Sequence, residues 1–185
     1  MTTTAPATIR VDNRDPRLGL ATAVGLARAV IARVDENQLH GPTLCTDVSV
    51  RDLLGQMVDT LTLVAGAARG EDAPTEPARD EDAPTQPARR NVRVAASGVA
   101  ETGWVEAWEK AAHELQAAWS APGVLERTMG LPFGELPGAA VLTVYTGRIT
   151  IQAWELAIAT QRPGWDVGTV AAALAASGWA GPPTR

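Results

Sequence analysis

Apolar side chains recur every three or four positions in four long stretches of the chain, which is the pattern of helices that bury one face. These stretches predict helices over residues 16–36, 50–69, 101–120 and 138–160. Two of the helix starts carry their own signals. Asp15 precedes Pro16 as an N-cap aspartate before a proline at the first helical position. Ser49 stands three residues before Asp52, as in a capping box.

The predicted buried stripes consist of aliphatic, tryptophan and small side chains. They comprise Leu20, Val24, Ala27, Ile31 and Val34 in the first helix, Leu54, Met57, Leu61 and Val64 in the second, and Trp104, Trp108, Ala111, Leu115 and Ala118 in the third. In the fourth, Leu142, Ile149 and Leu156 stand seven apart and can seat the helix in a core. We therefore predict an all-α fold: an antiparallel four-helix bundle with a short fifth helix at 167–178 and little or no β structure.

The segments outside these helices predict loops. Residues 1–14 are polar, and we expect a flexible tail before a single domain at 15–180. Residues 71–90 hold an imperfect tandem repeat with four prolines, which predicts a mobile insertion. This insertion is either a lid or partner-docking arm, or a duplication tolerated in a surface loop. Residues 125–131 suggest a short extended piece, and residues 131–138 a turn-rich connection.

A polar face runs along the fourth predicted helix, beside its core-facing positions. Val141, Tyr145, Arg148, Gln152 and Glu155 share this face, because each stands three or four residues from the next. The face is either the solvated side of an amphipathic helix or the polar wall of a cavity inside the bundle. A structural ion pair between Arg148 and Glu155 would explain two of these residues without any function.

Composition and charge narrow the class of protein. The chain has 185 residues, 45% of them hydrophobic and 20% charged, with a formal net charge of -5. An acidic chain lacks the basic face that nucleic-acid binding requires, so we expect no nucleic-acid partner. We see neither a membrane-spanning run nor a secretory signal, and expect no membrane association. A single cysteine, Cys45, excludes an internal disulfide. We expect a cytoplasmic protein, either a monomer or a small oligomer such as a homodimer.

The common motifs of cofactor and nucleophile sites are missing. The sequence has no phosphate-binding glycine loop, no nucleophile elbow and no cysteine pair for zinc or redox chemistry, so we expect no cofactor. Only two histidines exist, which is too few for a histidine-rich metal site, and His113 is expected to point outward. Cys45 has no lysine or histidine beside it, and we expect a small buried filler rather than a nucleophile.

An ordered set of short motifs nevertheless resembles a known family. The set comprises Asp15-Pro16-Arg17, Gln38-Leu39 followed by Pro42-Thr43-Leu44-Cys45, and the stretches 50–58, 121–128, 131–138 and 154–160. It is similar to the actinobacterial branch of the DinB-like superfamily that is related to mycothiol-dependent maleylpyruvate isomerase. The resemblance covers nearly the whole chain apart from the tail and the insertion, and it implies a DinB-type four-helix bundle.

The resemblance also implies a divalent metal, usually zinc or nickel, at one end of the bundle cavity. The family holds it with a histidine at the position of Gln56, and with a glutamate and a histidine at the positions of Arg148 and Gln152. All three residues are replaced in this chain. Glutamine is a poor neutral ligand for a transition metal, and arginine has no lone pair to offer. We therefore expect no metal site and do not carry the metal-dependent mechanism over to this protein.

The replacements predict a metal-free polar pocket instead. The candidate catalytic residues are Arg148, Gln152, Tyr145 and Glu155, and the candidate substrate-binding residues are Gln56, Asp59, Thr60, Trp104 and Trp108. A buried Arg148 would need Glu155, Asp59 or a ligand carboxylate or enolate as its partner. In such a pocket Arg148 would stabilise developing negative charge, while Tyr145 or Glu155 moves a proton.

Three hypotheses about function follow from this pocket. The first is a metal-independent enzyme that binds a small, largely apolar carbonyl compound and catalyses proton transfer as an isomerase, cyclase or lyase; such chemistry would suit actinobacterial secondary metabolism. The second is a non-catalytic protein that binds a small ligand or a partner. The third is a degenerate mycothiol-dependent isomerase or S-transferase. The first two differ in whether a bound ligand is converted, and the third in whether activity needs a thiol.

Overall fold

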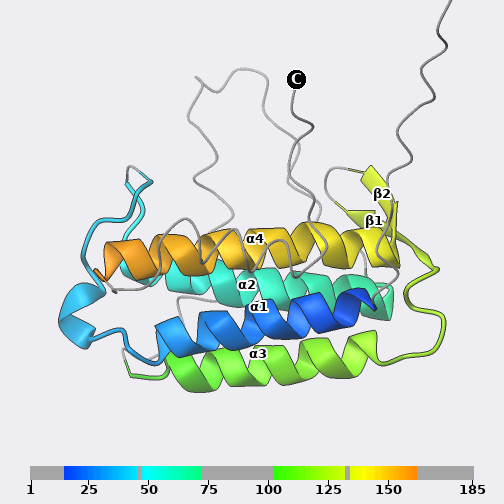
Figure 1. Ribbon diagram of the computed structural model, residues 1–185, viewed down its shortest axis with the longest axis horizontal. Coiled ribbons are helices and arrows are strands. Elements are labelled where there is room, and N and C mark those ends of the chain that lie inside the picture. Colours follow the sequence, from blue (N-terminus) through cyan, green and yellow to red (C-terminus); the bar gives the residue numbers. More distant parts are fainter. Residues whose placement is uncertain (1–14, 46, 72–101, 132–133, 162–185) are drawn as a thin grey trace, which may run out of the picture.

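The computed structural model describes residues 15–45, 47–71, 102–131 and 134–161, most of which form four long helices lying side by side (Figure 1). The elements are α1 (Pro16–Ile31), the 3-10 turn η1 (Glu36–Gln38), α2 (Val50–Arg69), α3 (Trp104–Trp119), β1 (Thr128–Leu131), β2 (Gly134–Pro137) and α4 (Gly138–Ala159). The predicted all-α class is confirmed, with one short β-hairpin between the third and fourth helices.

The helices pack in the cyclic order α1, α4, α2, α3, and α1 and α4 run opposite to α2 and α3 (Figure 1). At one end of the bundle the Arg51 guanidinium of α2 lies over the Trp104 ring of α3, 5.6 Å from its centroid. Toward the other end, the Trp119 indole N–H of α3 donates to the Val64 carbonyl of α2 at 3.1 Å. Consecutive helices α2 and α3 are therefore parallel, and the chain between them connects opposite ends of the bundle, as in four-helix bundles with one long crossover.

The starts of α1 and α2 follow the signals in the sequence. Asp15 accepts a 3.0 Å hydrogen bond from the Arg17 backbone N–H, and Pro16 occupies the first helical position. In the capping box of α2, the Asp52 backbone N–H donates to Ser49 Oγ at 3.2 Å. The Ser49 backbone N–H donates in return to Asp52 Oδ2 at 3.1 Å. Both predicted N-termini are therefore confirmed, because each satisfies backbone donors that the helix leaves free.

The end of α1 differs from the prediction of a helix over 16–36. The helix ends at Ile31, and the next backbone N–H groups, those of Arg33 and Val34, donate to carbonyls only three residues earlier. Such tighter bonds end an α-helix, while Val34 stays half-buried and so still fits the apolar stripe. By contrast α2 ends where predicted, at Gly70, whose φ of 80° suits the left-handed cap.

The predicted stripes form the hydrophobic core. Leu54, Met57, Leu61 and Val64 of α2 and Leu142, Ile149 and Leu156 of α4 are buried, as are Leu20, Ala27, Trp104, Trp108, Ala111 and Leu115. Val24 and Ala118 lie half-buried at the edge of the core, and His113 is exposed as predicted. The helical spacing of apolar residues therefore predicted the orientation of all four helices correctly.

The β-hairpin occupies the segment predicted as an extended piece and a turn-rich connection. Antiparallel strands β1 and β2 pair from Thr128 with Pro137 to Leu131 with Gly134. The hairpin leads directly into α4, whose first backbone N–H groups, on Gly138 and Ala139, donate to carbonyls of the segment before β1, both at 2.9 Å. A Cβ on Gly138 would lie 2.2 Å from the Val124 carbonyl oxygen, so only glycine fits this close approach.

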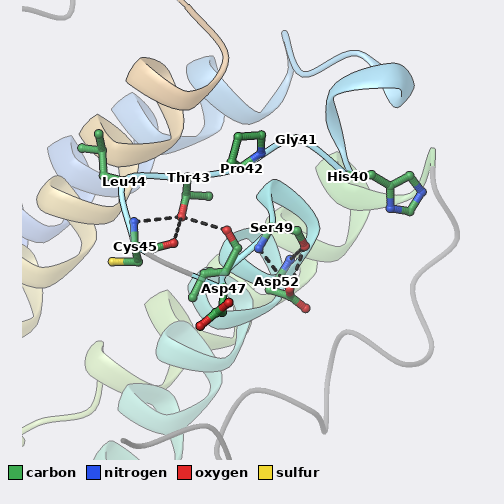
Figure 2. Close-up of a pocket in the computed structure, with 10 residues that line it drawn as sticks. His40, Gly41, Pro42, Thr43, Leu44, Cys45, Asp47, Ser49 and Asp52 are labelled. Atoms are coloured by element: carbon green, nitrogen blue, oxygen red, sulfur yellow. Dashed lines mark hydrogen bonds between the residues drawn. The ribbon is translucent and has the colours of Figure 1, made fainter.

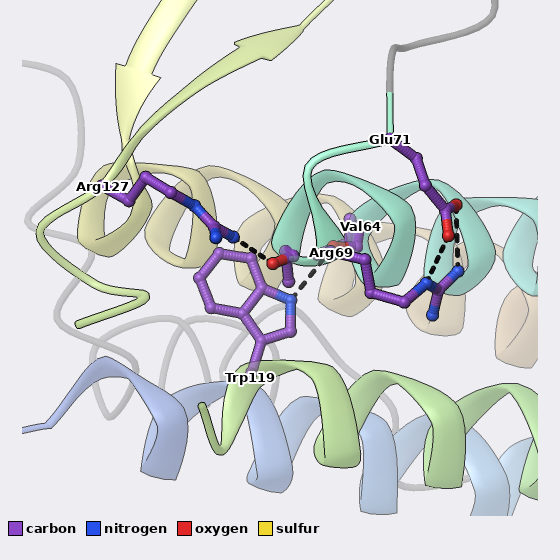
Figure 3. A network of polar contacts seen from close by, with 6 residues as sticks. Val64, Arg69, Glu71, Trp119 and Arg127 are labelled. Atoms are coloured by element: carbon purple, nitrogen blue, oxygen red, sulfur yellow. Dashed lines mark hydrogen bonds and ion pairs between the residues drawn. The ribbon is translucent and has the colours of Figure 1, made fainter. Parts of the chain in front are cut away.

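The last turn of α2 is fixed by contacts from the same region (Figure 3). The Arg127 guanidinium, just before β1, donates to the Ala68 carbonyl, and Trp119 donates to Val64. Arg69 and Glu71 form an exposed ion pair, with Arg69 Nε 2.5 Å from Glu71 Oε1. Arg127 thus satisfies the Ala68 carbonyl, one of the last four of α2, which the end of a helix leaves without a partner.

Several predictions fall outside the described residues. These are the tail at 1–14, the short fifth helix at 167–178 and the insertion at 71–90, apart from its first residue, Glu71. None of the described helices combines the length and the apolar content that crossing a membrane requires.

Candidate functional site

A buried polar contact joins α2 to α4 at the centre of the candidate site. Gln152 of α4 is 6% exposed and Thr60 of α2 is 3% exposed. The Thr60 hydroxyl lies 2.7 Å from the Gln56 carbonyl oxygen and 3.4 Å from Gln152 Oε1. A hydroxyl has one proton, and the shorter contact takes it. The Gln152 side-chain oxygen therefore lies beside the Thr60 hydroxyl without receiving its proton, and the amide remains able to bind a third group.

Tyr145 and Arg148 lie on the same face of α4, before Gln152. Tyr145 is buried, and this burial raises the pKa of its phenol while the positive charge of Arg148 partly opposes the shift. The phenol therefore stays protonated at neutral pH and can donate a hydrogen bond. Arg148 is exposed, and among the described residues it forms no ion pair with Glu155, with Asp59 or with any other carboxylate. Three partners were predicted for Arg148: Glu155, Asp59 and a carboxylate or enolate of a ligand. The geometry is compatible with the ligand as the partner.

Glu155 contacts the loop that precedes α2. Its Oε1 lies 3.6 Å from Cys45 Sγ, and the negative charge of Glu155, followed by burial, raises the pKa of the Cys45 thiol. Cys45 is exposed, so the prediction of a buried filler is wrong. The reason is that the loop lies along the outside of α4 instead of entering the core, and its neighbour Leu44 is 55% exposed. A raised pKa keeps the thiol protonated, which disfavours a role as nucleophile.

Gln56 and Asp59 are both half-buried on α2 but lie differently. Gln56 stands one turn before Thr60 and shares the side that faces α4. Asp59 is rotated by about 100° from Thr60, away from the Gln152 contact. Burial raises the pKa of the Asp59 carboxyl, and no described cation pairs with it. The structure therefore brings Thr60, Gln56 and Gln152 together and leaves Asp59 beside them.

The two tryptophans predicted as pocket walls lie away from this contact. The Trp108 indole N–H of α3 donates to the Val24 carbonyl of α1 at 3.3 Å, so this side chain lies between α3 and α1. Trp104 lies under the Arg51 guanidinium at the end of the bundle. Both are buried because α3 packs against α1 and α2, diagonally across the bundle from α4. Their burial supports a role in the core.

A concave surface lies in the loop between η1 and α2, apart from the Thr60–Gln152 contact (Figure 2). It is an open depression of about 570 Å³, lined by His40 to Cys45, Asp47, Val48, Ser49 and Asp52. Inside the loop the Thr43 hydroxyl lies 2.9 Å from the Val48 carbonyl and 3.2 Å from the Cys45 N–H. Sequence analysis missed this surface and its Cys45–Glu155 contact, because Gly41-Pro42 identifies a loop without showing which helix the loop touches.

The positions at which the family resemblance implies metal ligands do not suit a divalent cation. Arg148 is itself a cation without a lone pair, and the Gln152 oxygen already faces the Thr60 hydroxyl. Within residues 15–45, 47–71, 102–131 and 134–161, no three histidine, cysteine or acidic side chains are placed to hold a metal ion. We therefore derive no reaction step through a metal.

Two solved structures share the fold of this chain. The crystal structure of the mycothiol-dependent maleylpyruvate isomerase matches it with a TM-score of 0.65 and 15% identity, over 92% of this chain and 70% of that one. A histidine-to-alanine mutant of the mycothiol-dependent maleylpyruvate isomerase matches with a TM-score of 0.60 and 11% identity, over 80% of this chain and 63% of that one. At such identities the likeness shows a DinB-like helical fold and nothing about activity.

Relatives at the level of sequence are also known. No protein-family model matches the chain. The chain is 32% identical over 146 residues to the uncharacterized protein Rv0738 of Mycobacterium tuberculosis strain H37Rv, and equally to the uncharacterized protein MT0763 of strain CDC 1551. The match covers 79% of this chain and 68% of either relative. The chain therefore has a DinB-like helical fold and belongs to the same family as these uncharacterized mycobacterial proteins.

Proposed function

We propose that the chain is a metal-independent enzyme that binds a small carbonyl compound where α2 meets α4 and catalyses proton transfer as an isomerase, cyclase or lyase. The observation that carries this proposal is the buried Thr60–Gln152 contact, which lies on the same face of α4 as the protonated Tyr145 phenol and the Arg148 cation. The fold is shared with the mycothiol-dependent maleylpyruvate isomerase, so an isomerisation of a carbonyl compound is the first reaction to consider.

Each residue has a defined role in the proposed reaction. The Gln152 amide and the Tyr145 phenol donate hydrogen bonds to the carbonyl oxygen of the ligand. Glu155 takes a proton from the carbon beside the carbonyl, and the electron pair of that C–H bond moves into the enolate. Arg148 stabilises the negative charge on the enolate oxygen. Where a C=C bond of the ligand is conjugated with the enolate, return of the same proton to the far carbon of that bond shifts the double bond and completes an isomerisation, and no atom or electron is gained or lost.

A non-catalytic binding protein is the second candidate. It is favoured by the contact between Glu155 and the Cys45 thiol, since a carboxylate that faces a thiol is less available as a base. In that case Arg148 and Gln152 would hold a carboxylate or carbonyl ligand without converting it. A mycothiol-dependent activity is the third candidate. An activity that requires added thiol would distinguish this candidate from the other two.

The test is hydrogen–deuterium exchange at the carbon beside a carbonyl, followed by proton NMR in D₂O. The probes are pyruvate and maleylpyruvate, each with and without mycothiol. We expect the chain to accelerate exchange without thiol and Arg148→Ala to lose roughly a hundredfold of that rate, because a charge-stabilising group is removed. Arg33→Ala is the matched control, an exposed arginine that follows α1, and should keep the full rate.

Three results would overturn this proposal. Exchange at the same rate in Arg148→Ala removes Arg148 from the chemistry. Saturable binding of a probe without any exchange favours the binding protein, and exchange that appears only with mycothiol favours the thiol-dependent candidate. Circular dichroism of both variants shows whether a lost rate reflects a lost fold.

A further inference from the structure

The outer face of α4 carries a second apolar stripe, separate from the one that enters the core. Val144, Ile151 and Ile158 are spaced seven apart and are 47%, 48% and 39% exposed. At about 100° per residue, Ile151 lies on the opposite side of the helix from Leu142, which is 0% exposed. Apolar positions seven apart on an exposed face are the pattern of a helix that packs against another helix.

The residues beside this stripe differ between its two sides. Two residues of opposite charge, Arg148 and Glu155, lie along one edge of the stripe. Arg148 comes before Ile151 in the chain and Glu155 comes after it. Gly147 and Trp154 lie along the other edge of the stripe. Glycine has no side chain, and tryptophan has the largest. Trp154 is half-buried, and its indole N–H is buried without a hydrogen-bond partner in the described part of the chain.

We propose that this outer face of α4 is the interface of a homodimer, in which the α4 helix of a second copy packs antiparallel with its two-fold axis beside Ile151. A two-fold axis at this point sets each residue against one that lies on the same side of the stripe and about as far from Ile151 in the opposite direction. It therefore places Ile151 against its own copy, and Val144 against Ile158 of the second copy.

The flanking residues match under the same symmetry. Arg148 stands three residues before Ile151 and Glu155 four residues after it, so the axis brings Arg148 to within about 1.5 Å along the helix of the position opposite Glu155 of the second copy. Such an offset is within reach of both side chains, which gives two ion pairs related by the axis. Trp154 faces Gly147 of the second copy, so the largest side chain meets the position without one. Both pairings are between residues that differ in charge or size, and each is centred about half a residue from Ile151. This self-complementarity is the argument for a second copy as the occupant of the face.

The apolar stripe of the proposed dimer is separate from the proposed site. Val144, Ile151 and Ile158 point away from the contact between Thr60 and Gln152, so a variant there changes the interface without touching the amide. Arg148 and Glu155 belong to both proposals. The Arg148 guanidinium has five N–H donors, and an ion pair on the outer side leaves donors free for a ligand on the α2 side.

The first test is the mass of the full chain by sedimentation velocity. We expect a dimer at micromolar concentration, and roughly a hundredfold weaker association for Ile151→Glu, which places two carboxylates together at the axis. Leu18→Glu is the matched control, since Leu18 is an equally unpartnered apolar residue that is 65% exposed on α1. It should leave the dimer unchanged.

The second test exchanges the charges. Arg148→Glu and Glu155→Arg should each weaken the dimer by about tenfold, because each sets like charges against one another. The double variant should restore it. The double variant also removes Arg148, so restored association without restored deuterium exchange would support both proposals separately.

A monomer in the wild-type chain would overturn the dimer, and so would a dimer that Ile151→Glu leaves intact. If the wild-type chain is a monomer and removal of residues 162–185 makes it associate, the C-terminal segment of the same chain is the occupant. A charge exchange whose double variant associates no better than the single ones would place the axis elsewhere on the molecule.

Discussion

At its N-terminal end α4 is held by backbone groups, whereas at its C-terminal end the described contacts come from side chains. Gly138 and Ala139 donate their N–H groups to the carbonyls of Arg127 and Leu125, both at 2.9 Å. At the other end, Gln38 Nε2 lies 3.3 Å from the Thr160 carbonyl, and Cys45 Sγ lies 3.6 Å from Glu155.

This difference separates the fixed part of the candidate site from the part that a ligand or pH can alter. The backbone bonds at the hairpin set the position of α4 along α2, which is why Gln152 meets Thr60 rather than a neighbouring residue. Glu155 lies nearer the end that side chains hold, and one of its contacts is with a group that titrates. Changes at the first end should therefore affect folding, and changes at the second should affect chemistry.

The largest effect is expected at the hairpin end. Gly138→Ala places a Cβ where the Val124 carbonyl oxygen would lie 2.2 Å away, and backbone cannot yield as a flexible side chain does. We expect the free energy of unfolding to fall by about 3 kcal/mol, the upper part of the range for overpacking. Urea unfolding followed by circular dichroism measures the change.

The control for this variant is Gly25→Ala. Gly25 lies on an exposed face of α1, and an added Cβ meets no atom within 4 Å. Alanine should therefore stabilise the helix by about 0.5–1 kcal/mol through its propensity alone. Equal effects of the two substitutions would show that the close approach at Gly138 is not what holds the start of α4.

A smaller effect is expected where Gln38 reaches the other end of α4. Gln38→Ala removes the hydrogen bonds to the Thr160 carbonyl and from the Asp35 N–H, and should lower the free energy of unfolding by about 1 kcal/mol. Asn37→Ala changes an exposed neighbour in the same turn and should have little effect. A loss as large as that of Gly138→Ala would mean that the two ends are held equally firmly.

The smallest effect is kinetic and concerns Cys45. The charge of Glu155 raises the pKa of the thiol, so the reactive thiolate forms only at higher pH than in a free cysteine. Glu155→Gln removes that charge, and iodoacetamide should then alkylate Cys45 faster, with the rate rising at lower pH. Glu36→Gln, in η1, is the control and should leave the pH profile unchanged. An unchanged profile in Glu155→Gln would show that the loop does not rest on α4 in solution.

Local signals in the sequence predicted the helices well. The Ser49–Asp52 box marks the start of α2, and its bounds of 50–69 were predicted without error. The end of α1 was predicted too late, because the apolar stripe continues to Val34. Such a stripe indicates which residues are buried, and Val34 remains partly buried after the helix has ended. The direction of α3 depends on contacts between distant residues such as Val64 and Trp119, which no local pattern contains.

The candidate site was predicted less completely for a related reason. Helical spacing placed Tyr145, Arg148 and Gln152 on one face, but which residue of α2 meets Gln152 depends on how far the two helices are shifted along each other. That shift is set by the hairpin, whose pairing the sequence shows only as a turn-rich segment. The exposure of Cys45 depends likewise on where its loop comes to rest.

The parallel arrangement of α2 and α3 gives the connection between them spare length. A helix of 20 residues at 1.5 Å per residue is roughly 30 Å long, and about ten extended residues would cover that distance. Residues 70–103 are far more than this distance requires. Extra loop length costs little entropy, since each doubling adds only about 0.6 kcal/mol. A connection of this length can therefore take in added sequence, such as the tandem repeat at 71–90, without requiring either end of the bundle to move.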